Sequence, residues 1–278
     1  MRYVQRAVIA LFVVSVLIFG ASKATSFFQG NGSSPEIKSS SDVVKVKCDY
    51  TKQEILAGLT AYDKEDWNLK DEIMVGSISR FFEYGKSKVT YAVFDSSNRS
   101  ATYTRTVVFE DYTSPEITLT NPLVIKVNDF VDEKNLIGAT DVFDGDISSR
   151  VRITKNNINY NIAGTYSIGV EVTNSFGDVV KQELPVHIVT DPETLVDIDL
   201  KQNVLYLEKG QKFAPEKYVK RATSFYGKPM DVAAVQAFSN VNVNKAGCYE
   251  VEYRATDETG NTGVTYMIVI VTEKGGVK

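Results

Sequence analysis

The chain has 278 residues, of which 43% are hydrophobic and 24% charged, and its formal net charge is −4. This composition fits a folded globular protein and argues against a disordered chain. Because Lys and Arg form no basic cluster or stripe along the sequence, it also argues against a nucleic-acid-binding protein.

The N-terminal segment is apolar and follows basic residues. Arg2 and Arg6 precede the uncharged run 7–21. As a helix, these 15 residues measure about 22 Å, short of the ~30 Å hydrocarbon core of a bilayer, so a span also needs the flanking residues. The basic flank predicts that the N-terminus stays in the cytoplasm and that the rest of the chain is exported. We therefore predict a membrane-targeting helix at residues 1–28, either an uncleaved single-pass anchor or a signal peptide cleaved after Ala24.

The rest of the chain contains a repeat. Each copy opens with a Pro that follows a Ser or an Asp. These openings lie at 34–37, 114–117 and, in weaker form, 191–194. Their Pro residues are 80 and then 77 positions apart. Proline fits the first residue of an edge strand, where no ladder donor is needed. Near its end, each copy carries a segment that runs ten positions from a Gly to an Asp or Asn, at 85–95, 164–174 and 247–257.

These late segments have the pattern of half-buried strands. In the third copy, Tyr249, Val251, Tyr253 and Ala255 alternate with charged side chains. A period of two means that one face of the strand is buried and the other is in water. Polar turn residues and a second apolar segment follow each copy, which predicts a β-hairpin. The repeat therefore predicts an all-β array of three small β-sandwiches.

The boundaries follow from the repeated openings. We expect a flexible tether at residues 29–33 and a short tail at 274–278. Between them we expect three domains, at 34–113, 114–190 and 191–273. The linkers are short, which predicts that the domains follow one another end to end as a rod. Cys48 and Cys248 would then lie in different end domains, so we expect free thiols, with intermolecular pairing as the alternative.

The motifs of the second and third repeats resemble those of a known family. The second repeat carries Ala-x-Asp-x-x-Asp-Gly-Asp at 139–146 and Gly-Thr-Tyr at 164–166, and the third carries Gly-Cys-Tyr at 247–249 and Asp-Glu-Thr-Gly-Asn at 257–261. This combination is similar to the bacterial immunoglobulin-like repeat of Gram-positive cell-surface proteins, which is also appended to some pesticidal crystal toxins. The resemblance implies tandem immunoglobulin-like β-sandwiches in an extracytoplasmic setting, without implying one activity. The first repeat is a degenerate copy that keeps Ala61-Tyr62-Asp63 and Asp66.

Three carboxylates of the second repeat, Asp141, Asp144 and Asp146, are candidate calcium ligands. Ca²⁺ takes six to eight oxygens, often from closely spaced carboxylates. The alternative is that Asp144-Gly145 makes a tight turn in which the Gly takes a positive φ. The matching stretch of the third repeat, 226–229, lacks carboxylates, so a calcium site would not be a property of every repeat. No other cofactor is expected.

Tyr62 and Trp67 are candidate binding residues. They lie among Asp63, Glu65 and Asp66. An exposed aromatic ring rimmed by carboxylates suits contact with a sugar or a protein. The alternative is that Trp67 is the core Trp of the first sandwich.

No motif in the sequence supplies catalytic chemistry. His187 is the only histidine, and no Gly-x-Ser-x-Gly nucleophile turn or phosphate-binding Gly-rich loop is present. A zinc site or a catalytic triad at His187 is therefore not expected. We predict that the chain is not an enzyme.

Together these patterns predict a non-catalytic extracytoplasmic protein that is anchored in the cell membrane or secreted. The leading hypothesis is a cell-surface interaction or adhesion module that binds a protein or an envelope glycan. The alternative is a passive spacer or scaffold in a cell-envelope assembly. Exposed aromatic or acidic patches would favour binding, and a patch-free surface would favour a spacer.

Overall fold

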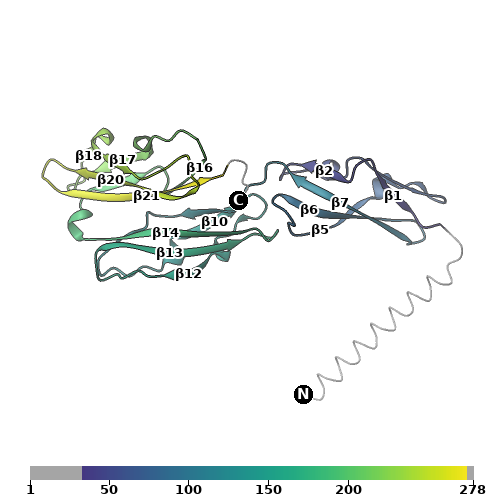
Figure 1. Ribbon diagram of the computed structural model, residues 1–278, viewed down its shortest axis with the longest axis horizontal. Coiled ribbons are helices and arrows are strands. Elements are labelled where there is room, and N and C mark those ends of the chain that lie inside the picture. Colours follow the sequence, from purple (N-terminus) through teal and green to yellow (C-terminus); the bar gives the residue numbers. More distant parts are fainter. Residues whose placement is uncertain (1–32, 274–278) are drawn as a thin grey trace, which may run out of the picture. The chain divides into compact units, whose positions relative to one another are not determined.

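The computed structural model describes residues 33–273 (Figure 1). In this part the chain is built from strands, short 3₁₀ turns and one four-residue helix, α2 (Lys52–Ile55). None of the helices between residues 33 and 273 is long and apolar enough to cross a membrane. The predicted N-terminal helix at residues 1–28 lies outside the described residues. The predicted all-β fold class is confirmed.

The strands form three copies of one arrangement, each with a three-stranded and a four-stranded sheet. In the first copy, the three-stranded sheet has the order β1 (Glu36–Ser39), β3 (Leu59–Asp63), β4 (Trp67–Asn68). Its four-stranded sheet has the order β2 (Val43–Val46), β7 (Ser100–Phe109), β6 (Lys86–Phe94), β5 (Met74–Ile78). In the second copy, the three-stranded sheet has the order β8 (Glu116–Leu119), β10 (Ile137–Asp141), β11 (Gly145–Asp146). Its four-stranded sheet has the order β9 (Val124–Lys126), β14 (Val179–Val189), β13 (Gly164–Thr173), β12 (Arg152–Asn156). In the third copy, the three-stranded sheet has the order β15 (Asp197–Leu200), β17 (Val219–Thr223), β18 (Pro229–Met230). Its four-stranded sheet has the order β16 (Val204–Glu208), β21 (Thr262–Thr272), β20 (Gly247–Thr256), β19 (Gln236–Ser239).

The pairing directions also repeat. In each copy the second strand pairs in parallel with the last one, as in β2 with β7, β9 with β14 and β16 with β21. The long hairpins β13–β14 and β20–β21 are antiparallel, as the alternating late segments predicted. Each sequence repeat therefore corresponds to one copy of this strand order.

The strands fall into two compact units. Among residues 33–273, the first comprises 33–42, Leu56–Ile78 and Val89–Arg105, and the second comprises Val43–Ile55, Ser79–Lys88 and 106–273. Tyr91, in the first unit, is fully buried. The buried guanidinium of Arg105 lies 5.1 Å from the centre of the Tyr91 ring, and its Nε donates a hydrogen bond to the Tyr91 hydroxyl at 3.0 Å. A cation above an aromatic face is stabilised by the ring quadrupole, which helps to hold this charge inside the unit.

In the second unit, the second and third copies share an apolar core. Ile268 and Ile270, on one face of β21, are buried among the core residues of the second copy. Met267, Val269 and Val271, on the other face, are buried in the core of the third copy. Because both faces of β21 are covered here, the strand is a continuous apolar run without the usual alternation.

The end-to-end arrangement predicted for these two copies is wrong, because they pack side by side. Figure 1 shows β20 and β21 lying along β14, and both strands contact it through their outer face. The outer face of the third copy's four-stranded sheet carries apolar residues that must leave water, and the second copy covers them. The linker between the copies holds only a 3₁₀ turn, Asp191–Glu193, closed by a capping box between Thr190 and Glu193.

Candidate functional sites

The β3–β4 hairpin of the first unit is held by a buried carboxylate. Asp63 Oδ1 accepts hydrogen bonds from the backbone nitrogens of Glu65 at 2.7 Å and Asp66 at 3.2 Å. The bond from Glu65, supported by those from Asp66 and from the Ser33 hydroxyl, lowers the pKa of Asp63 although burial opposes its charged form. The carboxylate thus caps its own turn as an anion.

Arg99 ties this hairpin to the turn between β6 and β7. Its guanidinium lies 2.6 Å from Glu65 Oε2 and 2.6 Å from Asp95 Oδ2. Asp66 Oδ2 also accepts a hydrogen bond from Ser96 N at 2.7 Å. The hairpin tip is therefore fixed from both sides.

The tip presents two aromatic rings to solvent. The exposed fractions are 51% for Tyr62 and 68% for Trp67, and the two ring centroids are 6.5 Å apart at an interplanar angle of 84°. The alternative that Trp67 is a core residue is therefore wrong. Trp67 also has a φ of 61°, which is unusual for a bulky residue. Gly145 holds the same turn position in the second repeat with a φ of 66°, so the hairpin turn itself requires this left-handed conformation.

The second repeat uses its predicted calcium ligands in a turn. Asp141 Oδ1 accepts hydrogen bonds from the backbone nitrogens of Phe143 and Asp144, and Gly145 has a φ of 66°. These features match the tight-turn alternative.

The other carboxylate oxygens of this trio also have protein partners. Asp144 Oδ2 lies 2.6 Å from the Arg150 guanidinium, and Asp146 Oδ1 accepts a 2.6 Å hydrogen bond from the Ser148 hydroxyl. Calcium binding by Asp141, Asp144 and Asp146 stays a prediction.

A different set of carboxylates converges in the first repeat. Oxygens of Asp63, Asp66 and Asp95 all lie within 4.8 Å of one another, the one such group of three found among residues 33–273. In the second repeat, Asn174 stands where the first has Asp95, and its Nδ2 donates to Asp141 Oδ2 at 2.9 Å. An amide therefore replaces the third carboxylate. The sequence already shows this difference, because the late segment of the first repeat ends in Asp95 and that of the second ends in Asn174.

His187 lies between the second and third copies and is buried. Its Nε2 is 2.8 Å from Glu250 Oε2 and its Nδ1 is 3.2 Å from Thr165 Oγ1. Its ring stacks on Tyr266 with 3.5 Å between centroids and 3° between planes. Both ring nitrogens thus have protein partners, so the surroundings of His187 are those of an interface residue.

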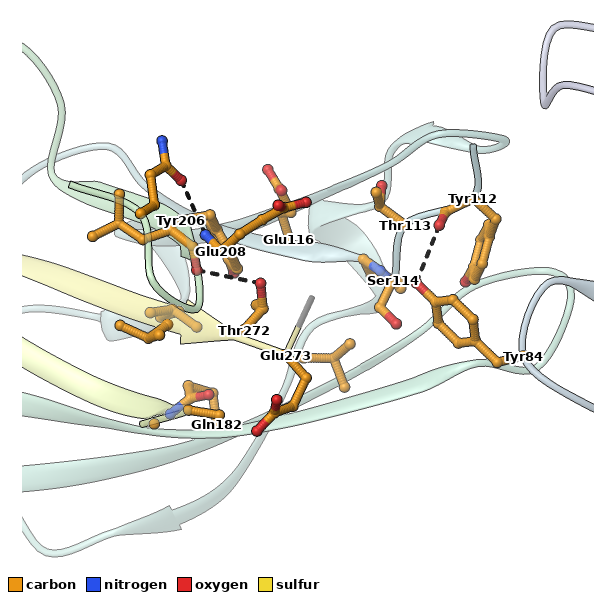
Figure 2. Close-up of a pocket in the computed structure, with 18 of the residues that line it drawn as sticks. Tyr84, Tyr112, Thr113, Ser114, Glu116, Gln182, Tyr206, Glu208, Thr272 and Glu273 are labelled. Atoms are coloured by element: carbon orange, nitrogen blue, oxygen red, sulfur yellow. Dashed lines mark hydrogen bonds between the residues drawn. The ribbon is translucent and has the colours of Figure 1, made fainter. Parts of the chain in front are cut away.

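The second unit also contains a cavity of about 660 Å³, which no sequence motif predicts (Figure 2). It is lined by segments far apart in the chain, including residues 110–116, 180–182, 206–208 and 270–273. The cavity forms where the packing of the third copy against the second brings these segments together with the end of the first copy.

Comparison with known proteins identifies part of the chain. Residues 200–271, which include β16 to β20 and all but the last residue of β21, match a family model described as a bacterial surface protein, Ig-like domain. The pesticidal crystal protein Cry22Aa of Bacillus thuringiensis is 30% identical over 125 residues, which are 44% of this chain and 16% of that protein. An uncharacterized 81.3 kDa protein of Acholeplasma phage L2 is 28% identical over 154 residues, 54% of this chain and 20% of that protein.

A solved structure is also similar in part. The lipoprotein BT2262 from Bacteroides thetaiotaomicron aligns with 28% of this chain and 38% of its own, with 29% sequence identity and a TM-score of 0.24. The chain spans no more than 20% of the length of the two curated relatives. The family resemblance predicted from the motifs is nevertheless confirmed for residues 200–271, which match the model of a bacterial surface protein Ig-like domain.

Proposed function

We propose that this chain is a non-catalytic extracytoplasmic interaction module whose first repeat binds a protein or an envelope glycan through Tyr62 and Trp67. The observation that carries this proposal is the 68% exposure of Trp67 at a hairpin tip. A Trp ring left in water offers a flat apolar face with a polar edge, which sugar rings and protein side chains cover favourably. Trp and Tyr are also the residues that most often dominate binding energy at interfaces.

The rigidity of the tip supports the proposal. The carboxylate of Asp63 caps the turn, and Arg99 bridges Glu65 and Asp95 across it. A ligand then meets two aromatic rings that are already placed, so little conformational entropy is lost on binding. The surface-protein family of residues 200–271 supports an extracytoplasmic setting.

A passive spacer or scaffold is the second candidate. The shared core of the second and third copies favours it, because Ile268 and Ile270 join the two copies into one stiff block. A spacer needs such stiffness but no exposed aromatic platform.

Binding of the purified chain to isolated cell envelopes distinguishes the two functions. We expect the wild-type chain to bind and the Trp67→Ala variant to bind at least about thirtyfold more weakly, the effect of losing a typical interface hot spot. Tyr226→Ala is the matched control, since Tyr226 is 69% exposed on a hairpin of the third copy and should leave binding unchanged. Equal binding of wild type and Trp67→Ala, or no binding at all, would favour the spacer.

Enzymatic treatment of the envelopes identifies the class of partner. If the ligand is a glycan, glycosidase digestion of the envelopes abolishes binding and protease digestion does not. The opposite result identifies a protein. Cell fractionation with surface protease treatment and intact-mass analysis tests the localisation, because an anchored chain keeps its full mass and a secreted chain loses the residues up to Ala24. Protease-protected protein inside the cell would contradict both.

A further inference from the structure

The cavity of the second unit forms where the third copy's sheet extends past the start of the second copy. In β16, Tyr206 lies on the face that packs against the second copy, and its hydroxyl accepts a hydrogen bond from Ile117 N at 2.5 Å. Glu208 follows two positions later on the same face of the strand. It lines the cavity together with Glu116 and the segment 113–115 (Figure 2).

The size and lining of this cavity suit a small ligand. Its volume of about 660 Å³ lies within the usual range for ligand pockets. Three aromatic side chains contribute to its wall, those of Tyr84, Tyr112 and Tyr206. Their hydroxyls bond to protein, for example Tyr84 to the Tyr112 carbonyl at 3.1 Å and Tyr112 to Asp178 at 2.8 Å. The hydroxyls hold the rings in place, and the rings supply an apolar surface.

The charges of the lining are strongly unbalanced. Among residues 33–273, the wall has one cationic side chain, Lys181, which pairs at 3.0 Å with Glu171 outside the cavity. It has five carboxylates, those of Glu110, Asp111, Glu116, Glu208 and Glu273. A concave surface with one sign of charge concentrates its field and attracts ions of the opposite sign.

Three of these carboxylates are already satisfied by the protein. Glu110 lies 3.4 Å from Lys45 Nζ, and Glu273 lies 3.2 Å from Lys209 Nζ. Asp111 accepts a 2.7 Å hydrogen bond from a backbone nitrogen.

The remaining two, Glu116 and Glu208, form no ion pair with any residue in the range 33–273. Partial removal from water raises the pKa of Glu116, so its charged form lacks compensation in the free protein. A bound cation would supply that compensation.

We propose that this cavity binds an organic cation with a primary ammonium group, which Glu116 and Glu208 hold while the tyrosine rings cover its carbon chain. An ammonium group offers three donors to carboxylate oxygens and is attracted to aromatic faces. A lysine side chain and an amino sugar both carry this group, so either source fits the chemistry. The proposal does not depend on the Tyr62–Trp67 surface, which lies in the first unit.

Calorimetric titration of the full chain at low salt tests the proposal with two pairs of probes. The first pair is a capped tripeptide Gly-Lys-Gly and the same peptide acetylated at the lysine Nζ. The second pair is glucosamine and N-acetylglucosamine. We expect at least one cationic probe to bind and its neutral counterpart to bind at least about tenfold more weakly, since a charged hydrogen bond is lost. Binding of the peptide alone, of the sugar alone or of both identifies the source of the ammonium group.

A double variant locates the binding. Glu116→Gln with Glu208→Gln keeps the shape of both side chains and should weaken the cationic probe about tenfold or more. Glu258→Gln is the control, because Glu258 is an exposed carboxylate of a hairpin turn outside the cavity and should leave the affinity unchanged. Circular dichroism confirms that each variant is folded, and in the wild type added salt should weaken binding.

Three results would overturn the proposal: no binding of either cation at millimolar concentration, equal binding of charged and neutral probes, or unchanged affinity in the folded double variant. Loss of envelope binding in Trp67→Ala with intact binding of the ammonium probe would leave this inference standing. The two proposals therefore fail independently.

Discussion

His187 Nε2 lies 2.8 Å from Glu250 Oε2, and this contact joins β14 of the second copy to β20 of the third. Tyr266 of β21 stacks on the same imidazole. The residues are 63 positions apart in sequence, so only the side-by-side packing of the copies creates this pair. It places a polar contact beside the apolar contacts of Ile268 and Ile270.

Removal of one partner should weaken the packing of the two copies. In Glu250→Ala, the buried His187 loses its carboxylate acceptor, which we expect to lower the free energy of unfolding by about 1–3 kcal/mol. Urea denaturation measures the change. Glu258→Ala, an exposed position in the same copy, serves as the control and should change stability by less than about 0.5 kcal/mol. Equal stability of the two variants would show that the pair contributes nothing.

Gly263, at the start of β21, has no room for a side chain. A Cβ at this position would lie 1.9 Å from the carbonyl oxygen of Val196. We expect Gly263→Ala to destabilise the protein by about 3 kcal/mol or more, because the backbone near β15 must move. In Gly76→Ala the nearest atom is 3.3 Å away, the Thr90 carbonyl oxygen, so the loss should be smaller. The midpoints of chemical denaturation compare the two variants, and an equal loss would contradict the steric argument.

Asp257 should make stability depend on pH in acid. Burial opposes its charged form, but hydrogen bonds from Thr259 and Asn261 outweigh this and hold the pKa of Asp257 below the ordinary value. A depressed pKa in the folded state contributes stability that is complete above the unfolded pKa of about 3.9 and is lost as the pH falls further.

The melting temperature between about pH 6 and pH 2 tests this assignment. We expect Asp257→Asn to be less stable than the wild type at the upper end and to lose less stability on acidification. Parallel curves for the two proteins would show that other carboxyl groups cause the acid sensitivity.

The two thiols should react slowly. Burial, assisted by Asp111, raises the pKa of Cys48 to about 12, and burial together with the charge of Glu250 raises the pKa of Cys248 to about 11. Because the thiolate is the nucleophile, iodoacetamide at about pH 8 should label the folded chain at least about tenfold more slowly than the urea-unfolded chain. Intact-mass spectrometry follows the reaction. Rapid labelling of both thiols in the folded chain would contradict these pKa shifts.

Local patterns predicted the strands well because each strand carries its own evidence. Val251, Tyr253 and Ala255 alternate with charged residues, and all three are buried in the core of the third copy. The Asp144-Gly145 turn was likewise one of two alternatives, and the left-handed φ of Gly145 agrees with it. Such features depend on neighbours in sequence, so they are visible without the fold.

The placement of Trp67 shows what local patterns leave open, since the sequence allowed both an exposed binding residue and a core residue. Its residue type favours a core, but it stands at a hairpin tip where the chain reverses, and its side chain remains 68% exposed. A second group of carboxylates was not predicted from the sequence, because Asp63, Asp66 and Asp95 meet only when two separate turns approach each other. Neither outcome can be derived from spacing alone.

By itself, the sequence determined the all-β class, the repeat and the family of residues 200–271, because these depend on periodicity and on motifs that recur along the chain. Only the tertiary structure decided that the second and third copies lie side by side and that Glu116 and Glu208 share a cavity. Those relationships join residues far apart in the chain, and the burial of the apolar outer face of β21 decides them. An alternating pattern shows that a strand has a buried face, but it does not identify the partner that covers that face.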